Sequence, residues 1–270
     1  MAGRSRRSEG FALLIVLWTL VLIAFLIAHL TADSSSEAQI AENLVANAVA
    51  EAAAEGAISQ AIFKFTDPRP ETRWPLDGTW HQIAIGNSRV AVRLEDEAAR
   101  INPNRASPAL LEALLVAVGS DEGTARNLAT AIGEWVGTLS DVSPAELLAE
   151  YRAAGRDYGP PGAPLESLGE LRHVLGMTPA LYAAIRPHLT LYGPAVPDIA
   201  HADPVVAAAL ARFSRAGAMP AAAVGAPRLA HITAIARGPG KARVVRAAVV
   251  TAGLGLPGGY LVLAFGSRVD

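Results

Sequence analysis

A run of twenty residues near the N-terminus, Phe11 to Leu30, contains no Asp, Glu, Lys or Arg. As an α-helix it would be about 30 Å long, which is the thickness of a bilayer's hydrocarbon core. Three arginines precede it (Arg4, Arg6 and Arg7), and the first charged residues after it are acidic. Because basic residues stay on the cytoplasmic side, the sequence predicts a single-pass inner-membrane helix over 11–31, with a C-terminal head in the periplasm.

Three processing routes fit such an N-terminus. A secretory signal peptide has a shorter apolar region and a small-x-small cleavage site, but Leu30 stands where a cut after Ala32 needs a small residue. The second route is an uncleaved anchor. The third is a pilin-like leader over 1–10, cut between Gly10 and Phe11, which leaves the apolar helix in the mature protein. We favour the third route because a short basic segment ending in Gly precedes Phe.

The predicted helix continues beyond the membrane. The segment Phe11 to Phe65 contains one Gly and no Pro, and its second half is rich in the good helix formers Ala, Glu and Gln. Ile40, Leu44 and Ala48 repeat at helical spacing, which predicts a narrow apolar stripe that packs on the head. We therefore expect one helix over 11–66, ended by two prolines that follow closely.

The remaining chain reads as strands, then helices, then strands. Two runs rich in Ile and Val, 80–85 and 89–94, flank Gly86-Asn87-Ser88 and predict a hairpin. Leucines at helical spacing follow, and strand-like runs return after His231. We predict an α+β fold, with a small antiparallel sheet interrupted by an all-helical insert. The expected boundaries are 67–100 and 228–270 for the sheet domain, 101–193 for the insert and 194–227 for a return linker.

Part of the insert resembles a SAM-like or helix-hairpin-helix unit, from Leu171 through Gly176-Met177-Thr178. Such a unit binds DNA phosphate through backbone N–H groups and needs basic residues nearby. The first hairpin candidate, 119–123, is acidic, and the second carries Pro179, which has no N–H. We therefore expect a structural role and no nucleic-acid partner. A membrane-anchored DNA-uptake protein is the alternative.

Composition and motifs give no sign of an enzyme. Net charge is −2 and cysteine is absent, which removes disulfides, thiolate nucleophiles and zinc thiolates. The segment 253–258 matches G-x-G-x-x-G, but it lacks the following helix that a dinucleotide site needs, so we interpret it as a hairpin turn. The six histidines are scattered and form no metal-binding motif. We expect no catalytic residues and no metal ligands.

Several blocks together resemble the K-type minor pseudopilins of the bacterial type II secretion system, the GspK family. The blocks are the leader ending at Gly10-Phe11, Glu95-Asp96-Glu97 before Arg100-Ile101-Asn102-Pro103-Asn104, the leucine-rich segment ending at Gly119, Ala131-Ile132-Gly133-Glu134-Trp135, then Tyr151, Tyr158 and Pro160, and finally 165–192. The resemblance implies a pilin-like helix, a pseudopilin α/β domain and a role in protein secretion across the outer membrane. It also implies the I- and J-type minor pseudopilins as partners, and a prepilin peptidase that cleaves before Phe11 and N-methylates it.

The resemblance makes Ile15 the fifth mature residue, where most pilins carry a glutamate. In related filaments that carboxylate pairs with the N-terminal amine of a neighbouring subunit, and an unpaired carboxylate in lipid costs about 2.5–3.5 kcal/mol. A subunit with no neighbour above it has no use for the acid, so we expect this chain to cap the tip of the pseudopilus.

The family also implies a calcium site built from acidic residues after Trp135. Here the segment 136–141 contributes one carboxylate, Asp141. Calcium takes six to eight oxygen ligands, several of them carboxylates. We therefore expect no cofactor in this chain, calcium included.

Overall fold

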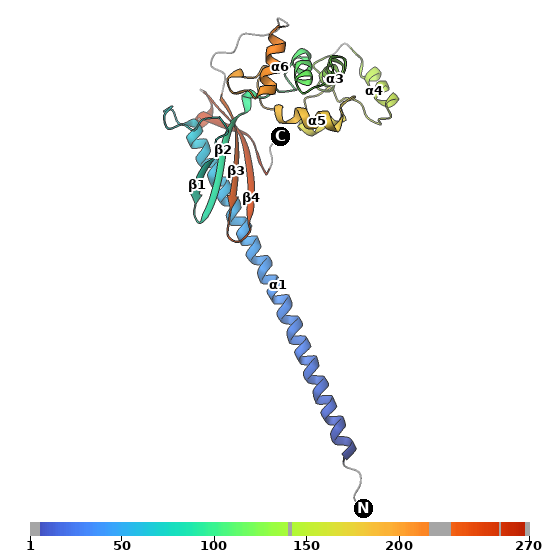
Figure 1. The fold of residues 1–270 in the computed structure, drawn as a ribbon, viewed down its shortest axis with the longest axis vertical. Helices are drawn as coiled ribbons and strands as arrows, with labels where there is room; N and C mark the ends of the chain where they lie inside the picture. Colours follow the sequence, from blue (N-terminus) through green and yellow to red (C-terminus); the bar gives the residue numbers. More distant parts are fainter. Residues whose placement is uncertain (1–5, 140–141, 216–227, 254, 268–270) are drawn as a thin grey trace, which may run out of the picture.

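One helix, α1 (Arg6–Thr66), runs from near the N-terminus into a head made of a sheet and a helical domain (Figure 1). The computed structural model describes residues 6–139, 142–215, 228–253 and 255–267, without the side chains of 6–10, 28–36 and 38. The sheet lies along the C-terminal half of α1, and the helical domain lies beyond the sheet, at the end opposite the N-terminus (Figure 1). The predicted α+β fold is confirmed.

The helix α1 first meets the head at the partly buried Ala46, and its fully buried face begins at Ala50. Its buried face consists mostly of small residues, which let the helix approach the sheet closely: Ala50, Ala53, Ala54, Ala57, Ile58, Ala61, Ile62 and Phe65. The prediction that the stripe packs on the head is wrong, because Ile40, Leu44 and Ala48 are all exposed. The contact is made by other residues of the same helix, most of them further along the chain.

Within the described part of the chain, no helix is both long and apolar enough to cross a membrane. The span expected over 11–31 lies partly outside the described residues, since the side chains of 28–36 are among those left out. The expected leader, 1–10, lies outside them as well, apart from the backbone of 6–10 in α1.

Five antiparallel strands form one sheet in sequence order: β1 (His81–Ile85), β2 (Ser88–Asp96), β3 (Arg228–Arg237), β4 (Arg243–Ala252) and β5 (Tyr260–Gly266). The β1–β2 turn is shorter than predicted, because Ser88 already pairs with Ile85 and leaves a two-residue loop. Gly86 there has φ 55°, a conformation that glycine adopts without strain. The chain between β4 and β5 forms a hairpin connection, as we interpreted 253–258.

The helical domain is inserted between β2 and β3, which pair directly with one another. Its elements are η1 (Glu97–Ala99), α2 (Pro108–Ala117), α3 (Glu122–Trp135), α4 (Pro144–Ala153), η2 (Leu168–His173), α5 (Pro179–Ile185), η3 (Arg186–His188), η4 (Ile199–His201) and α6 (Pro204–Arg215). Side chains of Ser107, Asp121, Ser143, Ser167 and Thr178 cap the first helical N–H groups, which explains where these helices begin.

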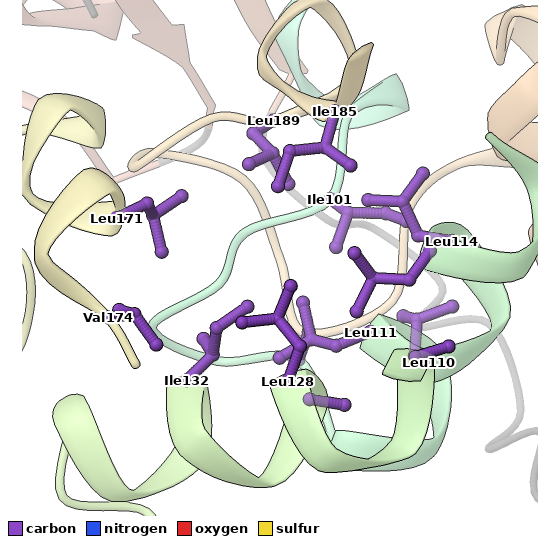
Figure 2. Packing of buried hydrophobic residues seen from close by; sticks show 14 of the residues in the cluster. Ile101, Leu110, Leu111, Leu114, Leu128, Ile132, Leu171, Val174, Ile185 and Leu189 are labelled. Atoms are coloured by element: carbon purple, nitrogen blue, oxygen red, sulfur yellow. The ribbon is translucent and has the colours of Figure 1, made fainter. Parts of the chain in front are cut away.

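The helical domain has a core of its own, separate from the core between α1 and the sheet. Leu110 and Leu114 of α2 and Leu128 and Ile132 of α3 point toward one another and toward Ile101 (Figure 2). Burying such side chains stabilises the domain by about 1.5–3 kcal/mol each, before entropy is counted.

The helix α6 lies in the segment that we expected to be a return linker, 194–227. Val206, Ala209, Leu210 and Phe213 have helical spacing, are buried, and join the core of the helical domain. The domain therefore continues past residue 193, to Arg215. Many alanines and prolines in this segment concealed the apolar face of α6. Residues 216–227 lie outside the described residues.

Candidate functional site: assembly surfaces

The acidic and basic block at 95–104 forms the neck between the sheet and the helical domain. The Arg100 guanidinium lies 3.0 Å from Glu97 Oε2 and 3.5 Å from Glu95 Oε2. Burial raises the pKa of Glu97, and the charge of Arg100 opposes that rise. Asp96 accepts the Ala98 N–H at 3.0 Å and so begins η1. These residues, singled out for their family resemblance, hold the neck in place.

Two asparagines of the same block tie the entry of the helical domain to later segments. The Asn102 side chain is buried and donates to the carbonyl oxygens of Leu191 at 3.0 Å and Gly193 at 2.9 Å. Asn104 accepts the Leu165 N–H at 2.8 Å and donates to the Leu165 carbonyl at 3.0 Å. The first residues of the helical domain are thus tied to its later segments around Leu165 and Leu191.

His231 of β3 lies beneath this neck. Its Nδ1 is 3.5 Å from Glu97 Oε2 and 3.3 Å from an Arg100 nitrogen. Burial and the nearby Arg100 lower the His231 pKa to about 4, so the ring is neutral at neutral pH. Arg100 therefore balances the charge of Glu97, and His231 does not.

A cluster of aromatic rings surrounds the Trp135 of the family-like block. The Trp135 ring lies 6.1 Å from Tyr151 and 6.3 Å from Tyr158, measured between centroids, and His173 completes the cluster. The Tyr151 hydroxyl accepts the Leu175 N–H at 3.0 Å, which links α4 to the end of η2. These side chains pack the domain. Asp141, the single acid that we weighed for calcium, lies outside the described residues.

The structure brings together Asp96, Asp198 and His201, a cluster that the sequence analysis did not predict. His201 Nδ1 lies 2.9 Å from Asp96 Oδ2, and Asp198 is close enough to join them around a metal ion. His201 lies 105 positions after Asp96 in the sequence, so no local motif could predict this contact. Both carboxylates also accept the N–H that begins a 3₁₀ helix. The cluster therefore already has a structural use, in joining η1 to η4.

The hairpin between α2 and α3 begins with an acid. Asp121 accepts the Thr124 N–H at 2.9 Å, and this hydrogen bond lowers the Asp121 pKa. A carboxylate thus occupies the α3 N-terminus, where a DNA phosphate would need positive potential. At the second candidate, Pro179 is the first residue of α5 and offers no N–H. The DNA-binding alternative gains no support from either place.

The residues predicted to be processed, Gly10 and Phe11, lie within α1, as does Ile15. Phe11 is 68% exposed and Ile15 is 49% exposed, and every described side chain from Phe11 to Ile27 is exposed in the single chain. This apolar rod surface contains no acid. Cleavage after Gly10 and methylation of Phe11 stay predictions.

A second apolar surface lies on the edge strand β5. Tyr260, Leu261, Val262, Leu263 and Phe265 are each 38–51% exposed, although apolar side chains of the other strands are mostly buried. The strand carries no charge from Tyr260 to Gly266. Exposed edge strands that are apolar and uncharged are rare in monomeric proteins, so β5 is a candidate contact with another subunit.

Together these features define a fold class: a long helix passes beside an antiparallel sheet, and the head is enlarged by a helical domain. Residues 90–195 match the family profile described as type II secretion system (T2SS), protein K. The fold matches a chain of the GspK-GspI-GspJ complex from the enterotoxigenic Escherichia coli type 2 secretion system. That match has a TM-score of 0.56 and 16% identity, and it covers 86% of this chain and 98% of the other. Among curated proteins, none matches this sequence.

The predicted resemblance to the K-type minor pseudopilins of the type II secretion system is therefore confirmed, by the family profile over residues 90–195 and by the likeness of the fold. The matched segment begins in β2 and runs through the neck and most of the helical domain. It contains every family-like block of the sequence except the leader, from the block around Arg100 to the one at 165–192.

Proposed function

We propose that this chain is a minor pseudopilin that caps the tip of the pseudopilus, anchored in the inner membrane by 11–31 with its head in the periplasm. In this proposal, prepilin peptidase removes the leader 1–10 and N-methylates Phe11. The observation that carries the proposal is the uncharged fifth mature position, Ile15. It lies in the apolar N-terminal part of α1, which has no acidic residue between Phe11 and Leu30.

The missing acid supports a place at the end of the stack. A carboxylate at position 15 would need the amine of a subunit above it, and without that partner it would cost about 2.5–3.5 kcal/mol in lipid. Ile15 removes this cost, so the chain needs no neighbour on that side. A subunit in the middle of the stack would gain from a glutamate there.

The shape of the head supports the same place. The helical domain lies beyond the end of the sheet, on the side opposite the N-terminus (Figure 1). A further subunit stacked above would have to share that space with α3, α5 and α6 (Figure 1). At the end of the pseudopilus, the same domain meets no neighbour.

The sequence of the rod supports the anchor. Fourteen of the twenty residues from Phe11 to Leu30 are Leu, Ile, Val or Phe. At about −0.4 kcal/mol each, they favour insertion by roughly 6 kcal/mol. The described side chains of this rod find no cover within the chain itself. For partners, we propose minor pseudopilins of the I and J types, in line with the complex that the matched structure is named for.

N-terminal sequencing of the protein extracted from membranes tests the processing route. We expect Phe11, carrying an N-methyl group, as the first residue. A chain that begins at Asp33, released into the periplasm without its rod, would refute the anchor and the tip-capping role together.

Replacement of Ile15 tests the charge argument. We expect Ile15→Glu to weaken association with the I- and J-type pseudopilins and to lower secretion. Ile15→Gln is the matched control, because glutamine has nearly the size and polarity of glutamate but carries no charge. Equal behaviour of wild type and Ile15→Glu in both assays would remove the charge argument.

A further inference from the structure

Three arginines lie side by side across the outer face of the sheet. Arg89 of β2 pairs in register with Arg237 of β3, and Arg237 pairs with Arg243 of β4. Paired residues point to the same face, and here that face is opposite α1, because Val90 and Ala236 are buried against the helix. Side chains in such pairs begin about 4.5–5.5 Å apart at Cβ.

The three side chains of this arginine row (Arg89, Arg237 and Arg243) are exposed. Among the ion pairs formed by the described residues, none includes any of the three. Lys241, in the turn between β3 and β4, adds a fourth exposed positive charge. Like charges directly opposite each other destabilise a sheet, so the row works against the stability of the isolated head. The neighbouring Arg246 differs, because it faces α1 and pairs with Glu51.

The row lies beside a shallow open groove of about 620 Å³ on the same face. Trp80, Ile235 and Ala91 supply apolar surface to the groove, and Gln82 and Asn87 supply hydrogen-bonding groups. Trp80 is 42% exposed and is held from one side by Arg93, whose guanidinium carbon lies 4.9 Å from the ring centroid. Positive charge beside an exposed tryptophan is typical of a protein contact, where Trp and Arg dominate binding energy.

The position of the row decides between a membrane and a protein as its partner. The β3–β4 turn meets α1 at Ala46, because a Cβ added to Gly238 would lie 2.9 Å from the Ala46 carbonyl oxygen. If the apolar run ends at Leu30, sixteen residues of helix separate the turn from the hydrocarbon, about 24 Å. That distance is more than twice the screening length of about 8–10 Å at physiological salt. The headgroup layer extends about 5–7 Å outside the hydrocarbon, which leaves about 17 Å. This is still beyond the screening length, so lipid phosphates are too distant to neutralise the row.

We propose that the arginine row and its groove bind an acidic segment of a neighbouring minor pseudopilin in the tip complex. The inference rests on the proposed function, because it takes the neighbour from that complex. Charge complementarity defines the occupant: a segment with two or three carboxylates to face the arginines and an apolar side chain to contact Trp80. The repulsion within the row is then a feature of the free subunit, which the partner relieves.

The test uses the full chain, produced together with the I- and J-type pseudopilins of its own system and solubilised in detergent. We expect Arg89→Glu combined with Arg237→Glu to weaken association about tenfold at 50 mM salt, and to flatten its salt dependence. Arg105→Glu changes an exposed residue of the helical domain and is the matched control. It should leave the strength of association and its salt dependence unchanged. Arg237→Gln should weaken association while raising the thermal midpoint of the free subunit by about 1–4 °C.

The outcomes separate the inference from the proposed function. If the unaltered chain does not bind the I- and J-type pseudopilins, the proposed function fails and the inference fails with it. If it binds them and the charge-reversed variant binds equally well with the same salt dependence, the inference alone is wrong. Nanodiscs of phosphatidylcholine, with and without phosphatidylglycerol, provide the last comparison. A weakening seen only with the anionic lipid would assign the row to lipid and overturn the proposal.

Discussion

The side-chain nitrogen of Asn102 donates a hydrogen bond to the carbonyl oxygen of Leu191, 3.0 Å away and 89 residues later in the chain. This contact ties the neck, where the chain passes from the sheet into the helical domain, to the segment that follows η3. Next to it, the Ile101 N–H donates to the His188 carbonyl at 2.9 Å, and the Thr190 N–H donates to the Ile101 carbonyl at 2.9 Å. The two segments therefore form an isolated parallel β-bridge between Ile101 and Leu189.

Replacing Asn102 by Ala should lower the free energy of unfolding of the head by about 2–4 kcal/mol. The reason is that the partly buried carbonyl oxygen of Leu191 and the buried one of Gly193 would lose their donor. Chemical denaturation followed by circular dichroism measures the change. Asn87→Ala, in the exposed β1–β2 turn, is the control and should change stability by less than about 1 kcal/mol. An equal loss in both variants would mean that the neck does not depend on Asn102.

The sequence reveals the elements of this fold better than the contacts between them. Apolar spacing predicted the long helix, the five strands and the helices of the insert, because each is a local pattern. The neck could be recognised only as a block that resembles a family. The roles of its members, such as Asn102 bonding to Leu191 and Arg100 bridging two glutamates, depend on residues far apart in sequence.

Local sequence patterns also failed to predict the buried face of α6 and the arginine row. The face of α6 is formed by Val206, Ala209, Leu210 and Phe213, set among other alanines and arginines, and the prolines around it indicated a return linker that is only partly helical. Arg89, Arg237 and Arg243 look like ordinary surface charges in the sequence. Only the register of β2, β3 and β4 makes them neighbours.

Two glycines with the same backbone conformation should respond differently to alanine. Gly137 has φ 74° and Gly162 has φ 63°, which disfavour any residue with a Cβ. A Cβ on Gly137 would also lie 2.5 Å from the Gly162 carbonyl oxygen, whereas a Cβ on Gly162 would meet nothing within 4 Å. We expect Gly162→Ala to cost about 1 kcal/mol and Gly137→Ala at least twice as much. Thermal unfolding of the two variants measures the difference, and equal midpoints would contradict this close packing.

The buried His231 should make stability depend on pH in the mildly acidic range. Its pKa is lowered from 6.5 to about 4 in the folded protein, so between these values the unfolded chain binds more protons. The contribution is therefore fully present above about pH 6.5 and is lost as pH falls toward 4. Its size is about 2–3 kcal/mol. Denaturation midpoints measured from pH 4 to 7.5 should show this slope in the wild type and a smaller slope in His231→Gln.

A second buried group near His231 acts in the opposite direction. Burial raises the pKa of Glu97, so this carboxyl takes up its proton more readily in the folded state and opposes the loss of stability at low pH. Because Glu97 is present in both proteins, the difference between wild type and His231→Gln isolates the histidine. Parallel curves for the two proteins over this pH range would show that His231 is not held neutral by its surroundings.

The exposed edge strand β5 should make the chain prone to self-association when partners are absent. Leu261 is 50% exposed on a strand without charge, so Lys at this position adds a charge to the edge and removes little buried surface. We expect Leu261→Lys to slow aggregation of the detergent-solubilised chain several-fold, with a thermal midpoint close to that of the wild type. Light scattering at 37 °C measures the rate. Val142→Lys changes an exposed apolar residue away from the sheet and serves as the control. If both variants slow aggregation equally, added charge alone is responsible and β5 has no special part in self-association.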